Sequence, residues 1–275
     1  MVISKIHGGL GNQLFMYAIG YAMARRNNDK LTLDATFLAT SIRDYGLGSL
    51  DIKFDKAYKI RKSYPYLIKV ALRKLLHSYL YLKYRIVKEK DWRVFDQDVL
   101  NQKGNILLDG YWVTYKYCEA YKAELQKMFT PTYETSASFK KLQAEMQQTN
   151  SVSLHVRRGD YVALGICLDV DYYRRAVDYM LQHVENPTFY VFSNDMDFCK
   201  EFLKDIEAKI VFVKYDVVDP AVDDLLLMKS CHHNILANST FSWWGAYANT
   251  TPGQIVVCPN EEKGNAKYPE AWIKL

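Results

Sequence analysis

The feature that most constrains the fold is a regular alternation of short apolar runs with longer helical segments in the carboxyl half of the chain. Runs of apolar, β-branched and aromatic residues predict strands at Ser151–Val156, Thr188–Ser193, Ile210–Val213, Asn234–Ala237 and Ile255–Cys258. The segments between them predict helices at Tyr172–Val184, Met196–Lys204, Ala221–Met228 and Phe241–Ala248. Strands that alternate with helices in this way are typical of a parallel, doubly wound sheet.

The amino end of the chain predicts a strand, a glycine turn and a helix in succession. Val2–Ile6 is the strand, His7–Gln13 is the glycine-rich turn, and Leu14–Ala24 is a long apolar helix. Such a turn presents backbone N–H groups and a helix amino terminus to an anion. The glycines match neither GxGxxG nor a P-loop. The alternative is a tight turn that packs a helix on a sheet, with Asn12 and Gln13 as caps.

The rest of the amino half is less regular. Further strands are predicted at Leu31–Asp34 and Ile106–Tyr111, and Asp44–Asp55 is expected to be rich in loops. Helices are predicted at Tyr117–Met128, before Pro131, and at Glu134–Asn150. The composition changes at Asn150, so the expected domains are residues 1–150 and 151–275.

The positive charge is concentrated in one segment. Lys56–Lys90 holds eleven Lys or Arg residues and one acid, a net charge of +10, so with +5 for the whole chain the remainder carries −5. One local patch argues against a nucleic-acid-binding protein. After Pro65, a helical apolar stripe is formed by Ile68, Leu72, Leu75, Tyr79 and Leu82. We expect the stripe to face the core; the alternative is a surface for peripheral contact with anionic lipid.

The composition indicates in which cellular compartment the chain acts. No apolar run approaches the roughly 20 residues of a membrane span, and the first residues do not resemble a signal peptide. The five cysteines are scattered without a CxxC pair, which predicts neither a zinc site nor a disulfide framework. A reducing compartment, the cytosol, is therefore expected. The sequence carries no signal for the oligomeric state.

Three aspartate pairs have the DxD spacing that holds a divalent metal in one large class of sugar transferases. They are Asp96/Asp98, Asp169/Asp171 and Asp195/Asp197. Short carboxylate patterns predict metals poorly, and Asp169 and Asp171 are placed where a helix begins. We therefore predict no metal site.

The most unusual stretch is Leu154–Tyr161, which reads LHVRRGDY. It places Arg157 and Arg158 at the carboxyl end of a predicted buried strand, the edge at which open α/β sheets bind ligands. A guanidinium offers a planar fork of donors that matches phosphate oxygens. The alternative is a surface ion pair between one of these arginines and Asp160.

Two further polar turns follow predicted strands and face the same edge. They are Ser193–Asp195 and Asn238–Ser242. The hydroxyl groups of the second turn either cap a helix or bind a phosphate beside its N–H groups. Three polar turns on one edge are stronger evidence for a nucleotide site than any one of these turns alone.

Four motifs together resemble glycosyltransferase family 11, the α1,2-fucosyltransferases. They are HGGLGNQLF at 7–15, HVRRGDY at 155–161, FSND at 192–195 and ANSTFSWWGAY at 237–247. The resemblance implies an α/β fold of GT-B type, with two Rossmann-like domains facing a central cleft. It also implies an inverting enzyme that needs no metal or cofactor and moves L-fucose from GDP-fucose to the 2-hydroxyl of a galactose-type acceptor. Such an acceptor belongs to a surface oligosaccharide, and the amino domain would hold it.

The resemblance also implies roles for individual residues. Arg157 would hold the β-phosphate, Arg158 would help hold the nucleotide, and Asp224 is the nearest match to an acid that reads guanine. The remaining nucleotide-binding residues would be Gly9, Gly11, Asn12, Asn194, Asp195, Ser239, Thr240 and Ser242. As the base that deprotonates the acceptor, Asp160 is the first candidate and His155 the second, although Asp160 could instead orient Arg157.

Two other functions fit the same motifs. One is a GDP-sugar transferase with another acceptor linkage, such as an α1,6 type. The other is a protein that binds a nucleotide or glycan without catalysis. Turnover of GDP-fucose with a galactoside acceptor separates these interpretations.

Overall fold

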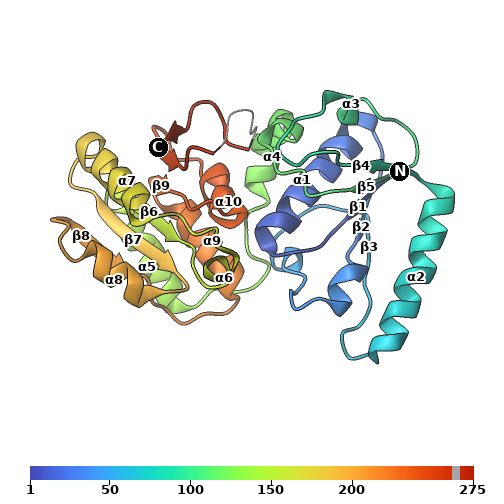
Figure 1. The fold of residues 1–275 in the computed structure, drawn as a ribbon, viewed down its shortest axis with the longest axis horizontal. Helices are drawn as coiled ribbons and strands as arrows, with labels where there is room; N and C mark the ends of the chain where they lie inside the picture. The colour runs from blue at the N-terminus through green and yellow to red at the C-terminus, as the bar shows by residue number, and fades with distance from the viewer. Residues whose placement is uncertain (262–266) are drawn as a thin grey trace. The chain divides into compact units, whose positions relative to one another are not determined.

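The computed structural model describes residues 1–261 and 267–275, whose contacts divide into two compact units. The amino unit comprises residues 1–130 with 267–268, and the carboxyl unit comprises residues 131–261 with 269–275. Each unit has its own sheet, in which every pair of neighbouring strands is parallel (Figure 1). The α/β class with two parallel sheets, expected for a GT-B-type fold, is therefore confirmed.

The sheet of the amino unit has the strand order β3-β2-β1-β5-β4. Its strands are β1 (Val2–Lys5), β2 (Leu31–Asp34), β3 (Lys56–Tyr58), β4 (Arg85–Lys88) and β5 (Ile106–Asp109). Its α-helices are α1 (Leu10–Asn27), α2 (Tyr66–Lys83), α3 (Gln97–Leu100) and α4 (Lys122–Lys127). Short 3₁₀ turns occur at η1 (Thr36–Thr40), η2 (Leu47–Ser49), η3 (Tyr115–Tyr117) and η4 (Glu119–Tyr121).

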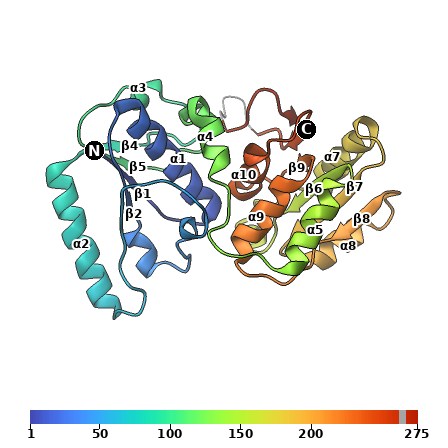
Figure 2. The same cartoon turned by 180° about the vertical axis from the view of Figure 1, so that it is seen from behind.

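Helices α1 and α2 cover opposite faces of this sheet (Figures 1 and 2). On one face Ser4 donates a 2.6 Å hydrogen bond to the carbonyl oxygen of Met16 in α1. A Cβ on Gly20 of α1 would lie only 3.0 Å from the Cβ of Ser4, so glycine permits this close approach. The neighbouring residue of β1, Ile3, points to the other face and packs with Leu80 of α2, as alternation along a strand requires.

The sheet of the carboxyl unit has the strand order β11-β10-β9-β6-β7-β8. Its strands are β6 (Ser151–Val156), β7 (Thr188–Ser193), β8 (Lys209–Phe212), β9 (His233–Ile235), β10 (Val256–Cys258) and β11 (Ile273–Lys274). Its helices are α5 (Ala137–Gln147), α6 (Asp160–Leu164), α7 (Val170–His183), α8 (Met196–Leu203), α9 (Pro220–Ser230) and α10 (Thr240–Ala248).

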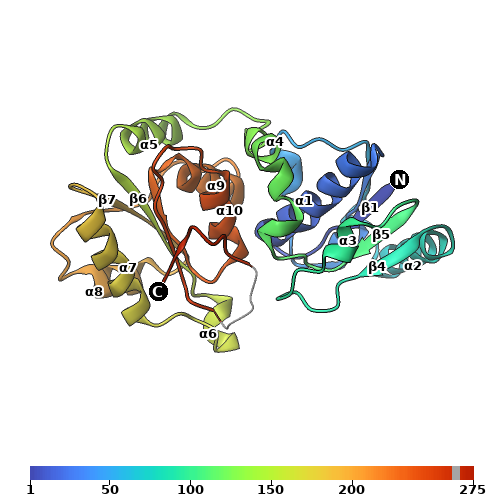
Figure 3. The same cartoon turned by 90° about the horizontal axis from the view of Figure 1, so that it is seen from above.

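The central strand β6 is buried along its whole length. Val152, Leu154 and Val156 point into a core built with α7 and α8. On the other face Ser151 donates to the carbonyl oxygen of Met146 in the α5 region, and His155 packs near Phe241 of α10. Figure 3 shows these two helical layers on either side of β6 and β7.

The division between the units lies one helix earlier than the expected boundary at residue 150. Helix α5 belongs to the carboxyl unit, because it is tied to residues far along the chain. Gln143 donates a 2.8 Å hydrogen bond to the hydroxyl of Ser230 at the end of α9, and Ser138 donates to Asp216 at 2.9 Å. A composition change at Asn150 does not reveal such contacts.

Most predicted elements are confirmed within a few residues, and the errors have physical causes. The predicted helix at Tyr117–Met128 is wrong in its first half, where Cys118 (φ −126°, ψ 0°) separates two 3₁₀ turns and only α4 is α-helical. Strands β3, β4 and β11 were not predicted. They are two to four residues long, and each is an edge strand of its sheet, where apolar alternation is weak.

The apolar stripe of α2 does not face the core, contrary to the sequence expectation. Its members are exposed: Ile68 (49%), Leu72 (39%), Leu75 (71%), Tyr79 (47%) and Leu82 (87%). The helix packs on the sheet through Leu80, which is fully buried with Ile3 and Leu107, and through Leu76 beside them. A period of 3.6 residues identifies apolar faces but not the face that docks, and α2 has two.

This orientation predicts unequal effects for two leucines of the same helix. Leu80→Ala is expected to lower the free energy of unfolding by about 2–5 kcal/mol, because it empties a packed site. Leu82→Ala is expected to change it by less than about 0.5 kcal/mol, because that side chain is exposed. Urea titration measures both. A larger loss for Leu82→Ala would contradict the orientation of α2.

Candidate active site

Three polar turns lie together at the carboxyl edge of the carboxyl unit, as the sequence predicted. They follow β9, β6 and β7, which are adjacent and parallel in the sheet. Hydrogen bonds join the turn after β6 to the turn after β7 directly, since the Oδ1 of Asn194 accepts from the backbone N–H of Arg158 at 3.0 Å.

Gly159 makes the close contact between these two turns feasible. Its φ of +47° lies in the region that favours glycine, and a Cβ there would lie 2.0 Å from the Nδ2 of Asn194. A side chain at position 159 would displace the amide of Asn194 and so disturb its hydrogen bond from the N–H of Arg158. The turn from β6 into α6 therefore requires glycine for both conformation and space.

Each arginine of the turn is held by a carboxylate. The Nη2 of Arg157 donates to Asp160 at 2.5 Å, and the Nε of Arg158 donates to Asp195 at 2.9 Å. Arg158 also stacks over the ring of Phe198, 3.8 Å from its centroid. The side chains of Arg157 and Arg158 remain 27% and 24% exposed. A guanidinium has five N–H donors, so these contacts orient both groups and leave donors for a ligand.

The first aspartate of each DxD pair caps a helix. Asp96, Asp169 and Asp195 are the N-caps of α3, α7 and α8, and each accepts from a backbone N–H of its own helix. Asp169 and Asp171 thus begin a helix, as predicted. Within residues 1–261 and 267–275 there is no cluster of three His, Cys, Asp or Glu side chains suited to a metal ion.

The hydroxyl groups of the third turn, Asn238–Ser242, have different roles: two belong to the cap of α10 and one is placed for an anion. Ser239 is the N-cap of α10 and accepts from the N–H of Phe241 at 3.2 Å. Ser242 is buried and donates to the carbonyl oxygen of Ser239 at 3.4 Å, so it belongs to the cap. Thr240 is the first residue of the helix and is partly exposed at its amino terminus. Of the three hydroxyls, that of Thr240 is the best placed for an anion.

His155 lies inside the fold beneath these turns. It is 6% exposed, and burial together with Arg157 lowers its pKa to about 3. A histidine with so low a pKa is neutral at pH 7 and is a weak base. These properties argue for a structural role and against proton transfer.

Asp224 lies on α9, which follows β8, and accepts a 2.7 Å hydrogen bond from the hydroxyl of Tyr215. Burial raises its pKa above the ordinary value. Its neighbour Asp223 is fully buried and accepts hydrogen bonds from Tyr133 and from the N–H of Val218. Among the described residues, no hydrogen bond or ion pair links Asp224 to the three turns.

The glycine turn of the amino unit leads from β1 into α1. Gly8 has a φ of +73°, and Gly9 is the N-cap without a side-chain hydrogen bond; Gly11 is buried and Asn12 partly exposed in the first helical turn. Gln13 is buried and donates to the carbonyl oxygens of Gly8 and Asp44 at 2.8 and 2.7 Å. It therefore braces the turn against the neighbouring loop and does not cap the helix.

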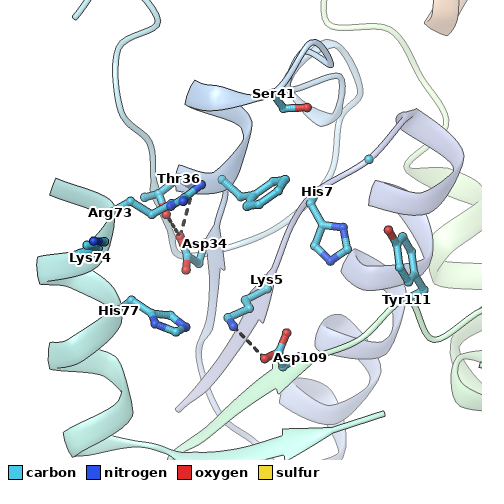
Figure 4. Close-up of a pocket in the computed structure, with 12 residues that line it drawn as sticks. Lys5, His7, Asp34, Thr36, Ser41, Arg73, Lys74, His77, Asp109 and Tyr111 are labelled. Atoms are coloured by element: carbon cyan, nitrogen blue, oxygen red, sulfur yellow. Dashed lines mark hydrogen bonds and ion pairs between the residues drawn. The ribbon is translucent and has the colours of Figure 1, made fainter. Parts of the chain in front are cut away.

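A cavity of about 550 Å³ opens at the carboxyl ends of β1, β2 and β5 in the amino unit (Figure 4). Two of its lining residues, His7 and Gly8, belong to the predicted glycine turn, and none of the lining residues was a predicted site residue. The others are Lys5, Asp34, Thr36, Phe37, Ser41, Arg73, Lys74, His77, Asp109 and Tyr111. Several of them directly follow or end a parallel strand, which is the signal that could have located the cavity.

Fixed charges and aromatic rings line this cavity. Lys5 donates to Asp109 at 2.8 Å, and the hydroxyl of Tyr81 donates to the same carboxylate at 3.2 Å. These contacts lower the pKa of Asp109 although burial opposes them. Asp34 accepts from the hydroxyl and the N–H of Thr36. The cavity thus offers oriented hydrogen-bonding groups beside apolar rings, which suits a polar ligand with apolar faces.

His7 projects into the cavity between two aromatic rings (Figure 4). Its ring lies edge-on to Tyr111 and to Phe37, with centroids 4.7 and 5.8 Å away. Burial lowers the pKa of His7, Asp109 raises it, and Lys5 lowers it further, with a net decrease below 6.5. The imidazole is therefore neutral at pH 7 and can accept a proton.

Comparison with known families and relatives covers the entire chain. The family model described as Glycosyl transferase family 11 matches residues 1–275. An α1,2-colitosyltransferase of Escherichia coli is 30% identical, over 100% of this chain and 99% of the relative. The O-antigen biosynthesis glycosyltransferase WbnK of Escherichia coli is 27% identical, over 99% of each. Galactoside α-(1,2)-fucosyltransferase 2 of Rattus norvegicus is 27% identical, over 87% of this chain and 64% of the relative.

Among solved structures, a mutant of Arabidopsis thaliana FUT1 in complex with GDP resembles this chain with a TM-score of 0.52. The two are 12% identical, and the match covers 96% of this chain and 71% of the other. At this level of identity the likeness shows the fold alone.

Proposed function

The chain belongs to glycosyltransferase family 11 and is an enzyme of the galactoside α1,2-fucosyltransferase family, and from this premise we propose its reaction. It transfers L-fucose from GDP-fucose to the 2-hydroxyl of a terminal galactose-type residue in a surface glycan, with inversion and without a metal ion. The observation that carries the proposal is the pair of oriented arginines at the carboxyl edge of the carboxyl unit.

The donor nucleotide binds at that edge. Arg157 holds the β-phosphate, and Arg158 with Asn194 and Asp195 fixes the geometry of the turn behind it. The partly exposed amino terminus of α10 at Thr240 contributes N–H groups to the phosphates. Asp224 is assigned to guanine on the family resemblance; its carboxylate already accepts from Tyr215 and would keep one oxygen for the base.

The proposed bond breakage places new negative charge on the departing GDP. As the bond from the anomeric carbon to the β-phosphate oxygen breaks, that oxygen acquires charge that must be stabilised. A cationic donor held in place before the reaction stabilises it without reorganisation, which is worth roughly 3 kcal/mol or more for one donor. Arg157, held by Asp160, is suited to this task without a metal ion.

The glycine turn of the amino unit offers an independent hint of ligand contact at Gly9. Its φ of −74° needs no glycine, and a Cβ placed there meets no described atom within 4 Å. Glycine is a favoured residue at an N-cap, and the open space here also allows a ligand to approach the backbone closely. The diphosphate is the ligand that we propose at this turn.

The acceptor binds in the cavity of the amino unit. Its volume of about 550 Å³ suits one or two sugar rings. Phe37 and Tyr111 offer apolar surfaces for the faces of a sugar, and Asp34 and Asp109 offer carboxylate oxygens that accept from hydroxyl groups. The O-antigen role in the name of WbnK supports a bacterial surface glycan as the acceptor. The five scattered cysteines, which form no CxxC pair, are consistent with action in the cytosol.

The base is better assigned to His7 than to the two candidates from the sequence. Asp160 already accepts a charged hydrogen bond from Arg157, which makes it a positioning residue. His155 is buried with a pKa of about 3. His7 is neutral and lies in the cavity where the acceptor hydroxyl would be, so it is poised to take the proton as the hydroxyl attacks.

One observation supports an alternative sugar donor. The E. coli relative that is 30% identical over the entire chain is named a colitosyltransferase, so a GDP-linked colitose is the alternative sugar donor. The other interpretations from the sequence, an α1,6-type transferase or a noncatalytic binding protein, are distinguished by the product.

The reaction is tested by incubating the protein with lactose and either GDP-fucose or GDP-colitose, with and without EDTA. We expect release of GDP and a 2′-fucosylated product from GDP-fucose at the same rate in EDTA. Faster turnover of GDP-colitose would reassign the donor, and a 6-linked product would reassign the linkage. No turnover with either donor would contradict the enzyme assignment, and loss of activity in EDTA would contradict the metal-free mechanism.

The base is tested by pH profiles of three variants. His7→Gln is expected to lower kcat by about 10²–10⁴ and to remove the acidic limb of the profile, in which activity falls as pH drops through the lowered pKa of His7. His77→Gln, in the same cavity, is the control and should keep that limb. Asp160→Asn should retain most activity, because its amide oxygen still accepts from Arg157. The reverse result for His7 and Asp160 would make Asp160 the base.

A further inference from the structure

Helix α2 exposes an extended apolar surface on the amino unit. The stripe of Ile68, Leu72, Leu75, Tyr79 and Leu82 is exposed along its whole length, its members by 39% to 87%. Successive members are spaced four, three, four and three residues apart, so they share one side of the helix. Single exposed apolar residues are ordinary, but a contiguous row along an 18-residue helix marks an interaction surface.

The apolar row is distinct from the side by which α2 docks on its own unit. Leu80 is fully buried, and Leu76, Arg73 and His77 are partly buried beside it. One face of α2, with Leu76 and Leu80, therefore packs on the sheet of the amino unit, and the apolar row lies on another face. Leu80 is the one fully buried residue of this helix, whereas Leu75 and Leu82 of the apolar row are 71% and 87% exposed and gain little from burial within the unit.

Cationic side chains accompany the apolar row. Lys74 is exposed and has no ion-pair partner among the described residues, and the exposed Lys83 lies near the ring of Tyr79, 5.3 Å from its centroid. Arg61 and Lys62 precede the helix and Arg85 follows it, all exposed. The segment from Lys56 to Lys90 carries +10 while the rest of the chain carries −5.

We propose that α2 docks in the plane of a bilayer that contains anionic lipid, with its apolar row among the acyl chains. Apolar residues on one side with flanking cations are the features of a helix that lies at a membrane interface. Each Lys or Arg near an anionic surface strengthens such binding, and the effect is screened by salt. No helix within residues 1–261 and 267–275 has the length and apolar composition to cross a bilayer.

Charge decides between a bilayer and a second copy of this chain as the occupant. A two-fold dimer through α2 would bring the same patch of each copy together, and the segment around it carries +10 in each. Like charges at an interface disfavour association. A surface of anionic headgroups is complementary to the same patch and also accepts the apolar row.

The position of α2 gives docking a consequence for the cavity of the amino unit. Arg73, Lys74 and His77, on the same helix, line that cavity (Figure 4). A bilayer against α2 would therefore lie beside the cavity and favour acceptors carried on a lipid. The docking does not rest on the proposed reaction, and failure of one leaves the other standing.

The surface is tested by sedimentation with vesicles. The full chain is mixed with vesicles of phosphatidylcholine alone or with phosphatidylglycerol, at low and high salt. We expect binding to the anionic vesicles that weakens with salt. The double variant Leu75→Glu with Leu82→Glu is expected to bind at least about tenfold more weakly, because two apolar side chains are lost and negative charge is added. Neither residue lines the cavity, so turnover of free lactose should be unchanged.

Val217→Glu is the matched control, because Val217 is 49% exposed and lies in the carboxyl unit. It should bind vesicles as the unmodified protein does, and thermal unfolding should show all forms folded. Equal binding to neutral vesicles, or no binding to anionic ones, would overturn the proposal. So would sedimentation velocity that shows a dimer which the double variant dissociates, since the apolar row would then be a dimer interface.

Discussion

The ion pairs that hold two adjacent arginines at one sheet edge are the interaction on which the functional geometry depends. Arg158 is fixed by Asp195, by stacking on Phe198 and by its own N–H to Asn194. Gly159 allows the turn after β6 to approach Asn194 closely, and Arg157 forms an ion pair with Asp160. Guanidinium groups held in this way face an incoming phosphate without the entropy cost of being ordered at that moment.

The same construction occurs in both units, with different chemistry. In each, a parallel sheet brings the residues that follow its strands to one edge. In the carboxyl unit that edge carries arginines and a helix amino terminus, which suit a diphosphate. In the amino unit it carries Asp34, Asp109 and His7 among aromatic rings, which suit a neutral, hydroxyl-rich ligand and the removal of a proton.

The sequence predicted the carboxyl half well because its signals are local. Buried strands such as β6 and β7 are apolar runs, and their turns have residues of characteristic type. The sequence left two interpretations of Arg157, an ion pair with Asp160 and a contact with phosphate. Both are compatible, because the ion pair orients the guanidinium that would bind the phosphate. Capping by Ser239 and phosphate binding at the same helix end are compatible in the same way.

The remaining features depend on contacts between distant segments. The cavity of the amino unit joins Lys5, Asp34 and Asp109, whose partnership requires knowledge of the strand order. The orientation of α2 depends on Leu80 meeting Ile3 and Leu107, which no periodicity reveals. The family motifs do not extend over Lys56–Lys90, so that segment had only its own composition to inform the prediction.

The central claim is that Arg157 stabilises the charge of the departing GDP, and steady-state kinetics of Arg157 variants test it most directly. For Arg157→Ala we predict a fall in kcat of about a hundredfold or more, a smaller change in the Kd for GDP-fucose, and an unchanged Tm. Arg157→Lys should recover part of kcat, because it keeps the charge but not the fork of donors. An Arg157→Ala protein that is folded and retains kcat within a few-fold would contradict the account.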